Sequence, residues 1–140
     1  MVMTVDRPYA ELLQRLRAVG LRPTRQRLAL ARLLFERGDR HVTADELHAE
    51  AETAGVGVSL ATVYNTLNQF TQAGLLREVA VEAGRAYFDT NTTDHHHFFF
   101  EEGGRLADIP AEGLSVAGVP EAPKGTEVAR VDVIVRLRRG

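Results

Sequence analysis

The chain has no cysteine among its 140 residues. This absence excludes disulfide bonds, thiolate metal sites, cysteine nucleophiles and haem attached through cysteine, so any bound metal must be held by nitrogen and oxygen atoms. No apolar run reaches the length of a membrane helix, and the segment from Met1 to Asp6 lacks a secretory pattern. We therefore expect a cytoplasmic protein without a membrane segment.

Aromatic residues are also scarce, at 6% of the chain, although the apolar fraction reaches 44%. A chain of this length suits one ordinary domain or two very small ones, and its core is modest. Such a chain often completes its core by dimerising.

Lysine is nearly missing, because Lys124 is the only lysine among the 17 basic residues. The net charge is -2, yet residues 15–40 carry eight arginines against Glu36 and Asp39. Guanidinium groups suit bidentate contacts with phosphates and base edges, so this stretch indicates nucleic-acid binding, with a solvated helix face as the alternative. The eight are Arg15, Arg17, Arg22, Arg25, Arg27, Arg32, Arg37 and Arg40.

Helical spacing of apolar residues, with caps and glycine stops, predicts four helices before residue 75. The first runs from Pro8 to Gly20 and the second from Pro23 to Gly38. The third begins with the capping box Thr43 to Glu46 and stops at Gly55. We expect its buried residues to be Ala44, Leu47, Ala51 and Ala54.

The fourth helix, residues 59–74, has two contrasting faces. One is an apolar stripe that faces a core and consists of Leu60, Val63, Leu67 and Phe70. The other has small and amide side chains without a carboxylate, which suits a helix lying in a major groove, although an ordinary solvent face is the alternative. This face holds Ala61, Thr62, Asn65, Asn68 and Gln69, with Tyr64 at the edge of the stripe.

The rest of the chain is rich in strand patterns. Residues 75–89 form a β-hairpin pattern, and three helices followed by a hairpin make a winged helix-turn-helix. The later strands are expected at residues 98–102, 105–109 and 131–137. The predicted fold class is α+β, with a winged helix-turn-helix at residues 1–89 and a small α/β domain at residues 90–140.

Three of the five histidines stand together in Asp94-His95-His96-His97-Phe98. In a strand, His95 and His97 point the same way and can bind one ion, whereas His96 faces the other side. The triplet is internal and opens an apolar strand, so it is not an expression tag. If Gly103 and Gly104 form a two-residue turn, Phe99 lies opposite Asp108, which puts Asp108 on the face of His95 and His97.

Together these motifs resemble the ferric uptake regulator family of bacterial metal-responsive repressors. The resemblance lies in residues 20–27, 41–47, 61–67 and 74–76 and in the histidine cluster. It implies that the fourth helix reads the major groove of a double-stranded, partly palindromic operator and that the C-terminal half forms a homodimer. The implied DNA contacts are Tyr64 and Asn65 on bases, beside Ala61 and Thr62 of the same motif, and Arg22 and Arg25 on the backbone or in the minor groove.

The resemblance also implies a regulatory metal site at His41, Asp89, His95, His97 and Asp108. Five nitrogen and oxygen ligands suit Mn(II), Fe(II) or Zn(II), and ligands from both halves let the metal set the angle between the DNA reader and the dimer core. The alternative is that His41 is an ordinary neighbour of a helix start and that the histidine triplet is a surface feature that binds no metal.

The chain departs from typical members at the structural zinc, because Phe100 and Gly103 occupy positions of the first cysteine pair. That zinc cannot be held here. The departure looks most like the iron response regulator branch, whose members are implicated in haem sensing. The cysteine-proline haem motif of some members is missing, so haem would have to be bound by His95, His96 or His97, with residues 98–100 as apolar walls.

The leading hypothesis is a homodimeric regulator of iron and haem homeostasis that acts as a repressor or activator. Within the same class, a free Fe(II) or Mn(II) sensor and a peroxide sensor remain open. From other classes, a His/Asp metallohydrolase and a winged helix used for protein contacts are the alternatives.

Overall fold

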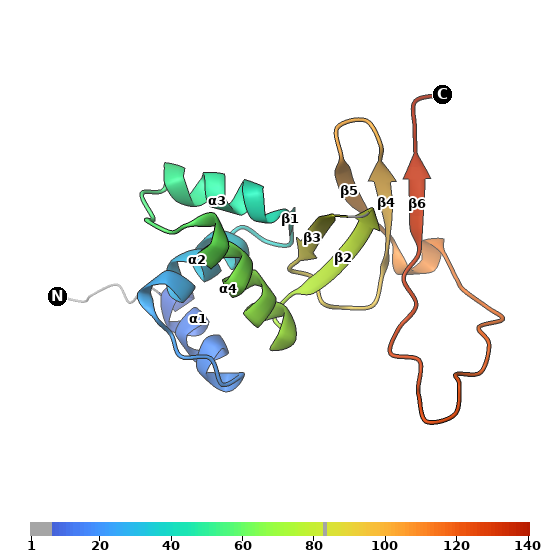
Figure 1. The fold of residues 1–140 in the computed structure, drawn as a ribbon, viewed down its shortest axis with the longest axis horizontal. Coiled ribbons are helices and arrows are strands. Elements are labelled where there is room, and N and C mark those ends of the chain that lie inside the picture. Colours follow the sequence, from blue (N-terminus) through green and yellow to red (C-terminus); the bar gives the residue numbers. More distant parts are fainter. Residues whose placement is uncertain (1–6, 83) are drawn as a thin grey trace. The chain divides into compact units, whose positions relative to one another are not determined.

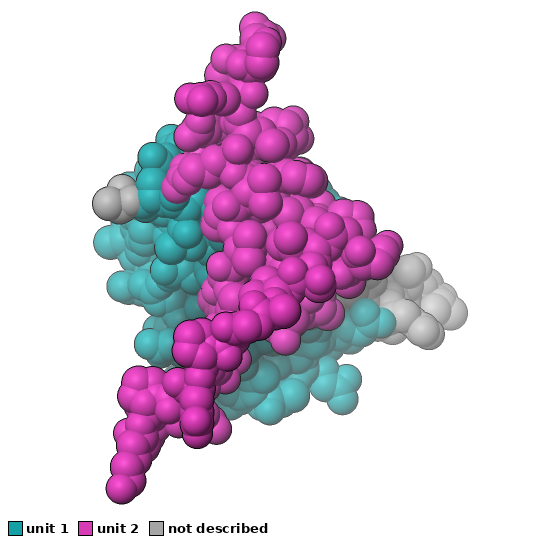
Figure 2. Space-filling model, turned by 90° about the vertical axis from the view of Figure 1, so that its right-hand side faces the viewer, with its two compact units in different colours: residues 1–92 teal, residues 93–140 magenta. Residues whose placement is uncertain are grey.

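The computed structural model describes residues 7–82 and 84–140. The chain divides into two compact units between Thr92 and Thr93, which Figure 2 colours separately. Unit 1 holds, in order, α1 Arg7–Ala18, α2 Arg25–Phe35, β1 His41–Val42, α3 Ala44–Thr53, α4 Leu60–Gln72, β2 Arg77–Glu82 and β3 Arg85–Asp89 (Figure 1). Unit 2 holds β4 His96–Phe100, β5 Arg105–Ile109, a short 3-10 helix Ala111–Gly113 and β6 Ile134–Leu137.

The helices of unit 1 begin where the capping residues predict. The hydroxyls of Thr24, Thr43 and Ser59 each accept a hydrogen bond from a backbone N–H in the first turn, and Thr43 and Glu46 form the complete capping box. The expectation that Ala54 is buried is wrong. It is the exposed C-cap of α3, so it lies beyond the turn that faces the core.

The core of unit 1 is built around the apolar stripe of α4. Val63, Leu67 and Phe70 have no exposed surface, while Leu60 is half-buried. They pack in one cluster with apolar side chains of α1, α2 and α3. Because the stripe faces inward, Tyr64 and Asn65 are left exposed on the opposite side of α4.

The wing is a three-stranded sheet in the order β1-β3-β2. The β2–β3 hairpin confirms the predicted one, whereas β1 was not predicted because two residues carry no periodic pattern. In β1, His41 is the Cα partner of Asp89 and Val42 that of Phe88. This strand therefore fixes the position of His41 against the end of the hairpin.

Unit 2 is a sheet in the order β5-β4-β6, with β4 antiparallel to β5 and parallel to β6. The predicted register is wrong by two residues, since Asp108 lies opposite His97 and not Phe99. The turn is longer than two residues: Gly103 and Gly104 both have positive φ, and the Gly104 N–H donates to the Phe100 carbonyl. An even shift preserves the face, so Asp108 still shares it with His95 and His97.

The second half of unit 2 contains less regular structure than predicted. The last strand begins at Ile134, although the Val133 carbonyl already accepts a hydrogen bond from the His97 N–H. Residues 114–133 form neither helix nor strand. Within the described parts of the chain, no helix combines the length and apolarity needed to cross a membrane.

Candidate metal centre and DNA-binding face

His41 and Asp89 form the first half-site, entirely within unit 1. They are direct partners on neighbouring antiparallel strands, so their side chains share one face of the sheet. His41 Nε2 lies 3.2 Å from Asp89 Oδ2, and Asp89 Oδ1 accepts from the Asn91 N–H at 2.9 Å. Arg77, the partner of Asp89 on the other side, is also buried on this face. The carboxylate is thus held with one oxygen directed at the imidazole.

His95, His97 and Asp108 form the second half-site, entirely within unit 2. Asp108 Oδ1 lies 3.1 Å from His95 Nε2 and 3.4 Å from His97 Nε2, and both imidazoles are buried. Two ligand atoms that each lie about 2.1 Å from one ion are separated by about 3.0 to 3.4 Å in octahedral or tetrahedral geometry. The distances from Asp108 Oδ1 to the two imidazole nitrogens are therefore those of ligands sharing an ion.

The tautomer of His95 supports a cation at this place. Its Nδ1 lies 2.6 Å from the Thr93 carbonyl oxygen, which can only accept, so Nδ1 carries the hydrogen. In the neutral ring Nε2 then presents a lone pair to the Asp108 carboxylate. Two electron-rich atoms at this distance repel each other unless a proton or a metal ion lies between them. The donor set therefore fits a divalent metal.

The other two histidines are placed differently. His96 lies on the opposite face of β4, where its Nδ1 accepts from the Val133 N–H at 3.1 Å. The hydrogen of its neutral ring is consequently on Nε2, so neither nitrogen presents a free lone pair. The haem candidates His95, His96 and His97 thus do not converge on one face. His48 directs Nε2 at the Val58 carbonyl oxygen, at 3.1 Å, and belongs to neither half-site.

The predicted DNA contacts lie on two neighbouring parts of unit 1. On α4, Ala61, Tyr64 and Asn65 are exposed, whereas Thr62 is half-buried and its hydroxyl accepts from Ser59 Oγ. Arg22 and Arg25 are exposed in the turn before α2 and at its first residue.

Arg27 and Gln69 connect these two parts through a contact that the sequence did not predict. Arg27 Nε and Nη2 donate to Gln69 Oε1 at 3.2 and 3.1 Å, and Nη1 donates to the Arg22 carbonyl at 2.9 Å. Gln69 is therefore a structural partner and not part of the free polar face of α4. The two residues are 42 positions apart, and no sequence signal joins them.

Comparisons with known proteins agree with this architecture. Residues 18–134 match the model of the ferric uptake regulator family. The chain is 33% identical over 106 residues to the peroxide-responsive repressor PerR of Staphylococcus epidermidis, covering 76% of this chain and 70% of that protein.

Two solved structures share the fold. The ferric uptake regulator of Vibrio cholerae has a TM-score of 0.71 at 22% identity, covering 91% of this chain and 98% of that one. The ferric uptake regulator of Pseudomonas aeruginosa with manganese has a TM-score of 0.67 at 24% identity, covering 90% and 96%. The chain therefore belongs to the ferric uptake regulator family of metal-responsive transcription regulators and is not an enzyme.

Proposed function

We propose that one divalent metal ion takes ligands from both half-sites, His41 and Asp89 of unit 1 and His95, His97 and Asp108 of unit 2. The observation that carries this proposal is the convergence of two buried imidazoles on one carboxylate oxygen, an arrangement that a shared divalent cation would stabilise. Neither half-site alone has enough donors for a closed coordination shell. Asp89 and His95 are joined by so few residues that an extended connection spans at most about 20 Å, so the connection allows the two half-sites to approach one ion.

The ion would link the DNA-binding unit to unit 2. Nitrogen and oxygen donors of this kind suit Mn(II), Fe(II) or Zn(II), and the bound ion supplies fixed coordination bonds to groups from both units. Metal occupancy would then restrict movement of the connection between the two units and favour one orientation of the DNA-binding unit. Such a regulator would act on chromosomal DNA in the cytoplasm.

The DNA-binding face is formed by α4 and by the turn before α2. Tyr64 and Asn65 are exposed beside Ala61, and no carboxylate on this helix would repel the phosphates, so α4 can enter a major groove. Arg22 and Arg25 would then reach the sugar-phosphate backbone or the minor groove and hold the helix in register.

A homodimer is proposed because unit 2 cannot complete a core alone. Among its described residues, the buried apolar side chains are Phe99, Leu106 and Ile109. The face of the sheet opposite the metal half-site carries apolar side chains that are half-buried, which a second copy would cover. They are Phe98, Phe100, Val133, Val135 and Leu137. Two DNA-binding units in a symmetric dimer would read a partly palindromic operator.

Peroxide is the first candidate effector beyond the metal, because a relative at 33% identity is a peroxide-responsive repressor. Haem, and with it a role in iron and haem homeostasis, is the second. It is favoured by a cavity of about 320 Å³ beside His95 and His96, which is lined by apolar side chains together with Asp94 and Arg130. Haem bound to His95 or His97 would compete with the divalent ion for the same Nε2 atoms.

The test begins with the purified, metal-free chain and a duplex enriched by this protein from a random DNA library. Affinity for that duplex is measured with Mn(II), Fe(II) or Zn(II), with haem, and after hydrogen peroxide is added to the Fe(II)-loaded protein. We expect at least one divalent ion to change the affinity by about tenfold or more. Identical affinity with and without every ion would refute metal control. A change in DNA affinity with haem alone would favour haem over peroxide as the effector.

A further inference from the structure

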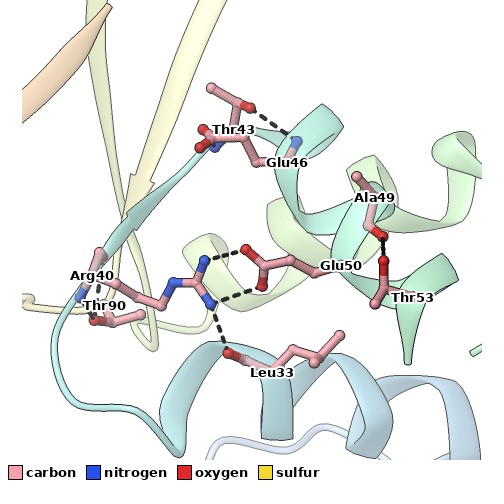
Figure 3. Close-up of polar contacts among 8 residues, drawn as sticks. All are labelled: Leu33, Arg40, Thr43, Glu46, Ala49, Glu50, Thr53 and Thr90. Atoms are coloured by element: carbon pink, nitrogen blue, oxygen red, sulfur yellow. Dashed lines mark hydrogen bonds and ion pairs between the residues drawn. The ribbon is translucent and has the colours of Figure 1, made fainter.

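Arg40 directly precedes the metal half-site residue His41 and contacts two helices of the DNA-binding unit (Figure 3). Thr90, which directly follows Asp89, pairs with Arg40. The two residues that flank the half-site are therefore joined to each other, and one of them is joined to the helices.

One backbone hydrogen bond and one hydrogen bond to a side chain continue the β1–β3 pairing by one position. The Arg40 N–H donates to Thr90 Oγ1 at 2.8 Å, and the Thr90 N–H donates to the Arg40 carbonyl at 3.0 Å. This pair continues the register of His41 opposite Asp89. Any change in the separation of the two metal-binding side chains is consequently passed to Arg40 through adjacent, hydrogen-bonded backbone.

The guanidinium connects this ladder to α2 and α3. Its Nη1 donates to the Leu33 carbonyl at 3.0 Å, in the last turn of α2, and to Glu50 Oε1 at 2.9 Å. Nη2 donates to the other oxygen of Glu50, on α3. The Arg40 side chain is only 19% exposed, so this bidentate ion pair is better shielded from solvent than a surface pair.

α3 is thus attached to the metal half-site at two points. Its N-cap residue, Thr43, directly follows the last residue of β1. Further along the helix, Glu50 is held by Arg40. A helix attached at one point can pivot, whereas attachment at two points makes it follow the strand. α3 packs directly on α4, the helix that carries the DNA-binding face.

We propose that Arg40 is a positioning residue that couples occupancy of the metal site to the placement of α2 and α3, and through them of α4. This inference rests on the proposed metal site and adds the residue that transmits its state. Arg40 does not bind the metal. Its guanidinium holds the β1–β3 strand pair and the helices α2 and α3 in a fixed relative position. Metal binding at His41 and Asp89 therefore shifts these helices and changes the affinity for DNA.

The experiment measures how strongly Mn(II) binding changes the affinity for DNA. For the wild-type 140-residue chain and its variants Arg40→Gln and Glu50→Gln, we measure Mn(II) affinity by calorimetry, thermal unfolding of the metal-free protein, and affinity for the enriched duplex with and without Mn(II). The ratio of the last two affinities is the coupling factor. Arg32→Gln is the matched control, because it removes an arginine–glutamate pair on α2 that does not touch the half-site.

We expect Arg40→Gln and Glu50→Gln to keep Mn(II) affinity within about threefold of the wild type while the coupling factor falls by about tenfold. The control should keep the wild-type factor. An unchanged factor in both variants would overturn the role of Arg40 while leaving the metal site intact. If Arg40→Gln fails to fold, Glu50→Gln decides the question, since glutamine is a good helix former and this substitution removes only the charged pair. Absence of any effect of Mn(II), Fe(II) and Zn(II) alike in the wild type would instead overturn the proposed function itself.

Discussion

Asp108 is the carboxylate that faces the imidazoles of His95 and His97, so it supplies the oxygen ligand of the proposed half-site in unit 2. Asp108→Ala should lower Mn(II) affinity by more than about tenfold, because even changes to groups that only support a ligand cost about 10- to 100-fold. Calorimetric titration of the metal-free protein measures this loss. Glu102→Ala removes an exposed carboxylate of the same unit and should leave Mn(II) affinity unchanged. Equal affinities in the two variants would remove Asp108 from the site.

Tyr64 and Arg25 should affect DNA binding in different ways. Tyr64 is 43% exposed on α4, where its ring can reach base edges, whereas Arg25 stands at the start of α2 beside the expected backbone contacts. Tyr64→Ala should reduce affinity for the enriched duplex more than for random DNA. Arg25→Ala should weaken both alike and reduce the slope of log affinity against log salt by about one. Binding isotherms at several salt concentrations distinguish these outcomes, and a uniform loss for Tyr64→Ala would contradict a base contact.

At the scale of elements, the contact between α2 and α4 depends on Arg27 and Gln69. Gln69→Ala removes the acceptor of two guanidinium hydrogen bonds and should lower the free energy of unfolding by about 1 kcal/mol. Gln72→Ala, an exposed change at the end of the same helix, should stay within about 0.5 kcal/mol of the wild type. Urea unfolding followed by circular dichroism measures both. If the two variants are equally stable, the Arg27–Gln69 contact contributes nothing measurable.

The elements also show what the sequence could and could not predict. Caps and glycines set the helix boundaries because they act within a few residues, as the capping box at Thr43 demonstrates. β1 was not predicted because it forms only through pairing with β3, which lies far along the chain. The β4–β5 register was wrong by two residues, since two adjacent glycines fit both a two-residue turn and the longer turn that forms.

In the candidate site, too, local patterns predicted some features, whereas contacts between distant segments were not predicted. Alternation along a strand placed His95 and His97 on one face, and the even error in register left Asp108 beside them. The assignment of His41 and Asp89 to one ligand set came from family resemblance and not from local pattern, because their pairing depends on β1. The contacts of Arg40 and Arg27 had no local signal at all, since each joins segments that only tertiary folding brings together.

At the scale of the whole molecule, dimerisation should depend on the half-buried apolar face of unit 2. Val135 lies in the middle of β6, beside Phe98 of β4, on the face opposite the metal half-site. Val135→Asp would place a charge in the proposed dimer core, where desolvation without a partner costs several kcal/mol. We expect a folded monomer at micromolar concentrations by sedimentation, with Mn(II) affinity retained and affinity for the enriched duplex reduced.

The matched control is Arg136→Gln, because Arg136 neighbours Val135 on the same strand but points to the other face, over the Phe99 ring. This variant should keep the dimer. The two variants together separate a dimer held by the apolar face from one held elsewhere. A dimer that survives Val135→Asp with unchanged affinity would place the second copy on another surface, and loss of the dimer in both variants would point to general damage of β6. Loss in Val135→Asp alone, with the duplex then bound one unit at a time, would tie the reading of a palindrome to the incomplete core of unit 2.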